Sequence, residues 1–216
     1  MRDSSNFKYS EWTEREFVMK LNREFYTRSG LDVAKDLLGK IIVHETPEGI
    51  VKGKIVEVEA YLGEQDKAAH SYKSKKEGRT NVQYEDGGYA YIYMIYGMYY
   101  CMNVVANKKG VPEAILIRGI EPIEGVELMK KRRGMDNTKN LCNGPGKLCI
   151  AFDINKSHYG IDLLGDELYI EEPEIKEDIE IIASKRINID YAEEAIDYLY
   201  RFTIKDNKYI SVPIRK

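Results

Sequence analysis

Apolar and polar positions alternate most clearly between residues 89 and 103, where the chain reads YAYIYMIYGMYYCMN. Tyrosines alternate with smaller or aliphatic residues up to Met94, and this period of two is typical of a β-strand. Gly97 interrupts the run and a second apolar run begins at Tyr99, which predicts a β-hairpin with Tyr96 at its tip. A tyrosine-rich sheet packed on the core would show the same alternation, so the pattern alone leaves the role of these tyrosines open.

The N-terminal half predicts two helices and a second hairpin. A T-x-x-E capping box at Thr13 and Glu16 is followed by apolar residues at helical spacing (Val18, Leu21 and Phe25), which predicts a helix that ends near Gly30. The segment LDVAKDLL predicts a short second helix that stops at Gly39. The runs KIIVHE and KGKIVEVEAYL then predict two strands joined through a turn.

The C-terminal half predicts further short elements. These are a strand over 114–118, a helix from Pro122 to just before Gly134, a short helix in NGPGKLCIAF, and the strands ELYIE and YRFTI. Because the strands mostly follow one another as hairpins, we expect an α+β fold with a curved antiparallel or mixed sheet, helices packed around it and a protruding hairpin. Without a Pro/Gly/Ser linker, residues 11–216 are expected to form one domain after a polar tail at 1–10.

Composition limits the class of protein. The chain has 216 residues, contains no apolar run near 18 residues and begins without the apolar region of a signal peptide, so we expect a soluble intracellular protein with no membrane contact. Its three cysteines are an odd number at spacings that fit no zinc site, so buried free thiols are expected. We predict no metal and no cofactor, and we interpret His44 and His158 as structural residues.

Charge is distributed unevenly. The net charge is −3, but residues 166–180 contain eight acidic residues and one lysine, and the rest of the chain has 32 basic and 28 acidic residues. A basic cluster at residues 130–133 falls where a helix would end, so it is expected to complement the helix dipole. The basic residues of the loop 73–79 have no such explanation, and a phosphate-contacting loop and a plain solvated loop both fit them.

The candidate chemistry lies on the strand IVEVEAYLG. A period of two places Glu57, Glu59 and Tyr61 on one face. That face could simply be exposed to solvent. Carboxylates two residues apart on one strand point alongside each other and not across a substrate, so we discount a paired-carboxylate glycosidase and expect one catalytic glutamate.

Five segments together resemble one known family. In this order, LDVAKDLLGK, IVEVEAYLGEQDKAAHS, YAYIYMIYGMYYCMN, ILIRGIEP and NGPGKLC are similar to the monofunctional alkyladenine (3-methyladenine) DNA glycosylases, and the resemblance covers about residues 22–212. It implies a DNA repair enzyme that flips alkylated or deaminated purines out of duplex DNA and hydrolyses the N-glycosidic bond, leaving an abasic site. The implied partner is double-stranded DNA with damaged purines, bound by a monomer in the cytoplasm, nucleoid or nucleus.

The resemblance also implies a role for individual residues. Glu59 would be the general base that activates water, Arg118 would help hold that water, and Ile187 would offer it a backbone carbonyl. Tyr61 would lie on one side of the flipped base, with His70 and Tyr93 on the other and Asn103 crowding the amino group of a normal guanine. Tyr96 would fill the gap in the duplex. Candidate DNA-backbone contacts are Lys73, Lys75, Lys76, Arg79 and Lys147.

These roles are physically reasonable. Extruding a base costs about a few kcal/mol, least for damaged bases, and an inserted aromatic ring can offset part of it, since base-on-aromatic stacking contributes about 1–3 kcal/mol. Tyrosine faces would hold a cationic alkylated base by cation–π attraction. The mechanism needs no lysine nucleophile, so we expect no AP lyase activity.

The chain differs from the family pattern in two places, and two alternative functions stay open. The connection between Asn103 and Arg118 is slightly long for the family, which affects the register of Arg118, and the basic loop carries lysines where relatives more often have arginines. The rivals are a nucleic-acid-binding module of similar fold without catalysis and a hydrolase that uses Glu57 and Glu59 together.

Overall fold

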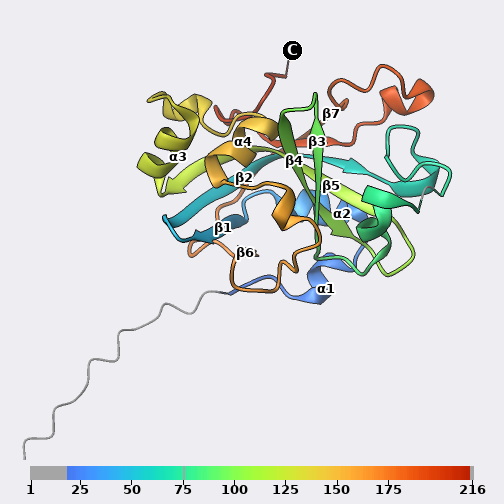
Figure 1. The fold of residues 1–216 in the computed structure, drawn as a ribbon. Coiled ribbons are helices and arrows are strands. Elements are labelled where there is room, and N and C mark those ends of the chain that lie inside the picture. The colour runs from blue at the N-terminus through green and yellow to red at the C-terminus, as the bar shows by residue number, and fades with distance from the viewer. Residues whose placement is uncertain (1–18, 75, 215–216) are drawn as a thin grey trace, which may run out of the picture.

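Eight antiparallel strands form one sheet in a mixed α/β fold, seen in the computed structural model of the protein (Figure 1). The structure describes residues 19–74 and 76–214. Strands run in the order β3-β4-β5-β2-β1-β6, with β8 paired to β2 and β7 paired to β8. Their bounds are β1 Ile41–Thr46, β2 Gly49–Tyr61, β3 Ala90–Ile95, β4 Tyr99–Ala106, β5 Glu113–Glu124, β6 Leu168–Glu171, β7 Ile181–Ser184 and β8 Arg201–Ile204. The expected sheet with helices around it is confirmed.

Helices cover the sheet. The α-helices are α1 Arg23–Tyr26, α2 Gly30–Leu37, α3 Val126–Arg133 and α4 Pro145–Phe152, and the 3-10 helices are η1 Gly63–Gln65, η2 Gly78–Tyr84, η3 Thr138–Asn140, η4 Lys156–His158 and η5 Glu193–Asp197. Helix α2 packs on β2 and β5, and α4 packs on β4 and β5 with α3 beside it (Figure 1). The core therefore lies between these helices and the middle strands.

Strand β2 is the centre of the sheet. Strand β5 pairs along one edge of β2, while β1 pairs with its first half and β8 with Glu57, Val58 and Glu59 on the other edge. Residues 55–60 are all buried. The alternative in which the two glutamates face solvent is therefore wrong, because both faces of this part of β2 are covered.

One expected helix start, at Pro122, is wrong, and so is the expected helical course of the chain through Leu21. Residues Lys20 and Leu21 run along β6, where the Leu21 N–H bonds the Ile170 carbonyl, and α1 begins only after its Asn22 cap. The capping box at 13–16 lies outside the described residues. Pro122 lies within β5 beside a bulge in which Ile123 is the extra residue of β5, a position where a strand tolerates a residue without an N–H.

Helix α3 therefore begins later than expected, after Gly125, but it ends at Gly134 as the sequence predicts. Its last turn contains the basic cluster 130–133, and Lys131 and Arg132 pair with Glu48. The expectation that this cluster belongs to the helix C-terminus is confirmed. The expected free, buried cysteines are also confirmed at positions 101, 142 and 149.

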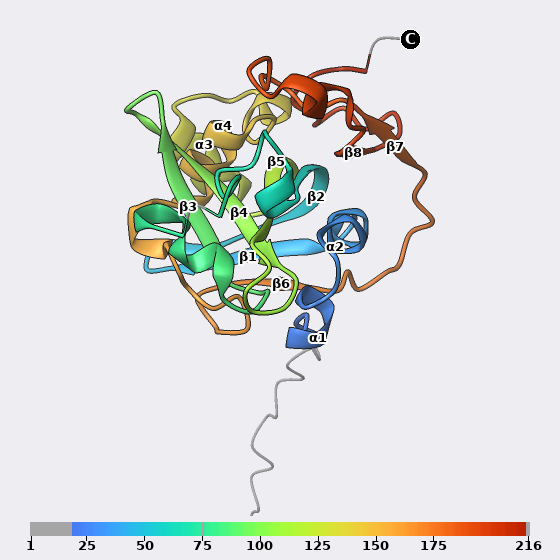
Figure 2. The ribbon, with the colours of Figure 1, turned by 90° about the vertical axis from the view of Figure 1, so that its right-hand side faces the viewer.

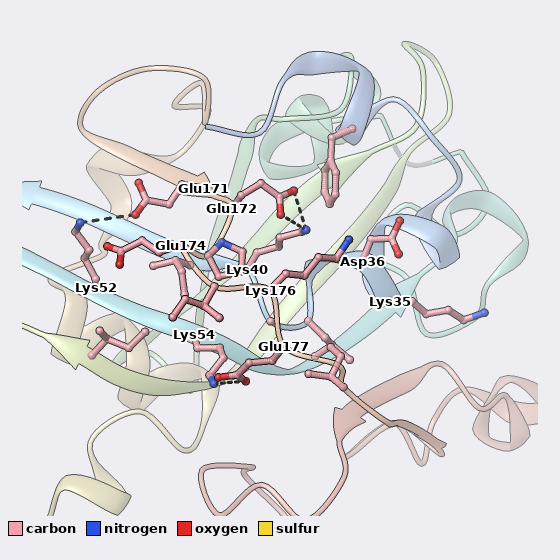
Figure 3. A pocket seen from close by; sticks show the side chains of 18 of the residues that line it. Lys35, Asp36, Lys40, Lys52, Lys54, Glu171, Glu172, Glu174, Lys176 and Glu177 are labelled. Carbon is pink, nitrogen blue, oxygen red and sulfur yellow. Dashed lines mark hydrogen bonds and ion pairs between the residues drawn. The ribbon is translucent and has the colours of Figure 1, made fainter. Parts of the chain in front are cut away.

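The acidic block neutralises lysines of the protein itself. Lys20 pairs with Asp166, Lys40 with Glu172 at 2.6 Å, and Lys54 with Glu177 at 2.8 Å. The connection between β6 and β7 runs along the outside of the molecule past α2 (Figure 2). It borders a cavity of about 660 Å³, whose lining includes the Lys40–Glu172 and Lys54–Glu177 pairs (Figure 3). Because lysines and carboxylates both line this cavity, and Lys40, Lys52 and Lys54 pair with carboxylates, it offers no charge of a single sign to a ligand.

No helix in the described part of the chain is long and apolar enough to span a membrane.

Candidate active site

Glu59 is a fully buried carboxylate with three hydrogen-bond donors. The Tyr61 hydroxyl donates to Oε2 at 2.8 Å, Arg118 Nη1 donates to the same oxygen at 3.3 Å, and the Ile187 N–H donates to Oε1 at 2.7 Å. A carboxylate can accept about four hydrogen bonds. Among the described residues, Glu59 therefore keeps one acceptor position on Oε1 unused.

Burial raises the pKa of Glu59, and the opposing effects of Arg118, the Ile187 N–H and the Tyr61 hydroxyl do not cancel it. A glutamate with a raised pKa is a stronger base once ionised. The environment thus favours proton transfer at this carboxylate.

A β-bulge aims Arg118 at the two carboxylates. In the β2–β5 pairing Val58 lies opposite Ile117 and Glu57 opposite Gly119, so Arg118 is the extra residue of β5. Its Nε donates to Glu57 Oε1 at 3.3 Å, while Nη1 reaches Glu59. Bulges re-aim side chains in this way next to active sites.

Glu57 differs from Glu59 in its donors, which are four in number and include two arginines. It receives Arg201 Nε at 2.7 Å, Ser211 Oγ at 2.8 Å, the Ser211 N–H and Arg118 Nε. Four donors are as many as a carboxylate ordinarily accepts. Gly119 leaves room for this carboxylate, since a Cβ there would lie 3.2 Å from Oε2. Glu57 therefore holds the two arginines in place, and none of its donors lines the aromatic cavity.

Tyr61 is fixed from two sides. Its hydroxyl donates to Glu59, and the Arg186 guanidinium lies 4.8 Å from its ring centroid. Arg186 is itself held by Asp66 at 2.5 Å and 2.8 Å and by the Ala60 carbonyl at 2.9 Å. This buried ion pair presets the orientation of the ring.

An aromatic cavity of about 40 Å³ lies beside Tyr61. Its lining brings together four predicted base-pocket residues with five others: Tyr61, His70, Tyr93 and Asn103, and Ala68, Gln83, Tyr91, Ala114 and Tyr191. A water molecule occupies about 30 Å³ in the liquid, so the cavity as it stands has room for about one water. Admitting a ring requires the side chains to part.

His70 forms one wall of this cavity together with Tyr93. Their rings meet edge to face with centroids 4.7 Å apart, and His70 Nδ1 bonds the Tyr91 hydroxyl at 2.8 Å. Burial, assisted by the charge of Arg79, lowers the pKa of His70 to about 4. The imidazole is therefore neutral at neutral pH and presents an uncharged face to the cavity.

Asn103 is buried on β4 with its amide anchored. Its Nδ2 donates to the Tyr91 carbonyl at 3.0 Å, across the β3–β4 pair in which the two residues are opposite each other. The amide therefore has a fixed position at the cavity wall.

Tyr96 lies in the three-residue connection between β3 and β4, which consists of Tyr96, Gly97 and Met98 and is called the β3–β4 turn below. Tyr96 is 74 % exposed and Met98 66 % exposed. Tyr96 has a positive φ of 53°, a conformation unusual for a tyrosine, and Figure 2 shows the turn at the outer end of β3 and β4. The expected antiparallel pair with an aromatic residue at its end is present.

The basic candidates lie around these features. Lys73, Lys76 and Arg79 are exposed, and the Arg79 guanidinium is 5.7 Å from the Tyr93 ring centroid. Lys147 lies in α4, whose Gly146 packs against Tyr99 beside the turn. Lys75 lies outside the described residues.

Several contributing residues were not foreseen from the sequence. Tyr91 shares the strand face of Tyr93, so its spacing could have indicated it. Gln83, Tyr191, Arg186 and Arg201 come from distant segments without a recognisable motif, so nothing in the sequence pattern places them at the site.

Comparison with known proteins gives consistent matches. The model of the family described as methylpurine-DNA glycosylase (MPG) matches residues 24–208. A relative from Clostridium novyi is 58 % identical over 202 residues, covering 90 % of this chain and 99 % of the relative, and its name is "Putative 3-methyladenine DNA glycosylase". Proteins of the same name from Clostridium acetobutylicum and Desulfitobacterium hafniense are 55 % and 49 % identical, each covering 90 % of this chain and 98 % and 100 % of their own length.

Proposed function

The chain belongs to the methylpurine-DNA glycosylase family, and on this premise we propose how its residues perform the reaction of a 3-methyladenine DNA glycosylase in DNA repair. The proposal is that Glu59 activates a water that displaces a damaged purine from its sugar in duplex DNA. The substrate class is 3-methyladenine, 7-methylguanine and hypoxanthine, and the product is free base and an abasic site.

One observation carries the assignment of Glu59. Of the two buried glutamates on β2, only Glu59 accepts a hydrogen bond from a residue of the aromatic cavity, the Tyr61 hydroxyl, whereas the donors to Glu57 are Arg118, Arg201 and Ser211. The raised pKa of Glu59 suits a general base, and its negative charge would stabilise the oxocarbenium-like sugar that forms as the base leaves. This asymmetry argues against a hydrolase that uses both glutamates.

Arg118 acts as a positioning residue in this proposal. It contacts Glu59 and Glu57 at 3.3 Å each, which fixes the Glu59 carboxylate. We propose that Arg118 also helps to hold the attacking water, and that the Ile187 carbonyl contributes, as its N–H already bonds Glu59.

The aromatic cavity is the proposed base pocket. Tyr61 on one side and His70 with Tyr93 on the other would stack on the extruded base, and their faces would attract a cationic alkylated purine. The anchored amide of Asn103 would exclude the exocyclic amino group of normal guanine. Opening of the cavity would accompany base flipping, with Tyr96 replacing the base in the stack.

The proposal includes hydrolysis without strand cleavage. Among the described residues, none of those that line the aromatic cavity is a lysine, so no amine is positioned to attack the sugar. We therefore propose an enzyme that leaves the abasic strand intact. The basic residues Lys73, Lys76, Arg79 and Lys147 are proposed to contact the DNA backbone, and binding should weaken steeply with salt. We expect the protein to act in the compartment that contains the chromosome.

The test is release of free base. Duplexes with 3-methyladenine, 7-methylguanine or hypoxanthine are incubated with the protein, and free base is separated by chromatography. We expect release by the wild type and a loss of about 10²–10⁴-fold in Glu59→Gln, because general base catalysis contributes that much. The matched control is Glu48→Gln, the same change at a glutamate that pairs with α3, which should keep full activity.

Three results would contradict parts of the proposal. Absence of base release by the wild type contradicts glycosylase activity, full activity of Glu59→Gln contradicts the assignment of the base, and a nicked strand under mild conditions contradicts hydrolysis without lyase chemistry. Lesion-specific DNA binding without any base release would favour the non-catalytic binding module.

A further inference from the structure

Two histidines that are far apart in the sequence lie side by side in the fold. His44 lies on β1 and His158 at the end of η4, and their Nε2 atoms are 3.2 Å apart. Glu167, immediately before β6, places Oε1 3.5 Å from His158 Nε2 and 4.0 Å from His44 Nε2. Both imidazoles are buried, at 2 % and 5 % exposure, whereas the Glu167 side chain is 60 % exposed.

We propose that His44, His158 and Glu167 bind a divalent transition metal, with Zn²⁺ the best match. Two imidazole nitrogens and one carboxylate oxygen are a donor set that zinc accepts and that Mg²⁺ and Ca²⁺ disfavour. The site is separate from the aromatic cavity, with which it shares no residue.

The distances fit a zinc ion. A point equidistant from the three ligand atoms lies about 2.1 Å from each, which matches Zn–N and Zn–O bonds of about 2.0–2.2 Å. Two of the three separations are close to the edge of a tetrahedron with such bonds, about 3.3 Å. Only the distance from His44 to Glu167 is longer, and the exposed Glu167 side chain can close it by a small rotation.

The hydrogen-bond partners of the two Nδ1 atoms also favour a metal site at the Nε2 atoms. His44 Nδ1 donates to the Phe152 carbonyl at 2.6 Å, which leaves the lone pair on Nε2. His158 Nδ1 lies 3.1 Å from the Asn155 N–H and 3.3 Å from the Asn155 carbonyl, so it can either accept or donate a proton. Metal-binding histidines almost always donate their other N–H to a carbonyl or carboxylate, and both histidines have one available.

The carboxylate is also available. In the described part of the chain no lysine or arginine pairs with Glu167, although its neighbour Asp166 pairs with Lys20. Its exposure leaves the fourth coordination position to water. A bound ion would join β1 to η4 and to the residue before β6, both more than one hundred residues further along the chain, and would therefore stabilise the folded protein.

The test is zinc binding by the full-length, tag-free protein. The protein is stripped with a chelator and titrated with Zn²⁺ in competition with a chromophoric chelator, and Co²⁺ is used in parallel because its visible spectrum reports tetrahedral coordination. We expect one ion per chain, a tetrahedral Co²⁺ spectrum, and a melting temperature that rises with Zn²⁺. His158→Gln should abolish all three, and Glu167→Gln should weaken zinc binding at least about tenfold.

Two control variants make the assignment specific. Asp166→Asn removes the adjacent carboxylate, and His70→Gln removes the remaining histidine of the chain, so both should bind zinc as the wild type does. Since Glu167 is exposed, Glu167→Gln should fold even if His158→Gln does not. Absence of zinc binding by the wild type, or equal binding by the wild type and Glu167→Gln, would overturn the proposal and leave the histidines as a hydrogen-bonded structural pair.

Discussion

The centre formed by Glu57, Glu59 and Arg118 and the β3–β4 turn lie in the same sheet but are built in opposite ways. In the centre both carboxylates are fully buried and hydrogen-bonded before any ligand arrives. At the turn, Tyr96 and Met98 are largely exposed. The difference indicates that the carboxylates and Arg118 already have fixed positions in the free protein. The exposed side chains of the turn, in contrast, would be buried only when DNA binds. Changes in the centre should therefore affect folding or rate, and changes in the turn should affect binding alone.

The largest expected effect on stability comes from Glu57. Glu57→Gln leaves the buried Arg201 and Arg118 without a full counter-charge, and breaking a buried ion pair from one side costs about 3–5 kcal/mol. We expect a decrease of that size in the free energy of unfolding in urea. Glu59→Gln is the matched comparison two residues along the same strand, and it should not lower stability. Equal losses in the two variants would show that the glutamates do not differ in role.

The turn should show the opposite behaviour. Tyr96→Ser removes an exposed ring, so the free energy of unfolding should change by less than about 0.5 kcal/mol. Affinity for a lesion duplex should decrease by about 1–3 kcal/mol, about 5–150-fold, if the ring stacks in the helix. Binding is measured in a Glu59→Gln background to prevent turnover.

Tyr96→Phe is the control for the turn, because it keeps the ring and should bind as tightly as tyrosine. If Tyr96→Ser binds lesion and undamaged duplexes as the parent does, Tyr96 does not enter the DNA. If it unfolds more easily instead, the turn is part of the folded core and the contrast with the centre is wrong.

Local patterns predicted the elements of the site better than its contacts. Alternating tyrosines predicted the β3–β4 pair, and the period of two placed Glu57, Glu59 and Tyr61 on one face of a strand, since this period depends only on neighbouring residues. The roles of Glu59 and Tyr61 come from the family resemblance and stay predictions. Whether Glu57 was exposed could not be predicted, because its partners Arg201 and Ser211 are about 150 residues away. A period of two predicts a strand, but it does not predict that other strands pair with both edges of β2.

The errors have similar physical causes. Pro122 indicated a helix start, but a bulge in the β2–β5 pairing lets β5 continue through it. Leu21 fitted a helical stripe, yet its backbone pairs with β6. The same kind of bulge determines where Arg118 points, and a bulge is not visible in the pattern of side chains. The interpretation of His44 and His158 as structural residues is not among these errors and stays a prediction, but their proximity could not be foreseen, because a sequence shows spacing and not proximity.

The smallest expected effect is a pH dependence of stability, which would distinguish Glu59 from Glu57 within the centre. Burial raises the pKa of Glu59 in the folded protein above its value of about 4.3 in an unfolded chain. A carboxyl whose pKa is raised by folding stabilises the folded state fully at pH values below its pKa in the unfolded chain. This contribution to stability is lost as pH rises through the pKa of the folded protein.

Glu59→Gln cannot ionise. Its stability relative to the wild type should therefore increase with pH across that window, by at most about 1.4 kcal/mol per pH unit. Urea unfolding of both proteins at a series of pH values measures the difference. A difference that grows toward acid would mean that Glu59 is stabilised as the anion, and the centre would then be a structural salt bridge like that of Glu57. A constant difference would mean that folding does not shift the pKa of Glu59, which would contradict this prediction.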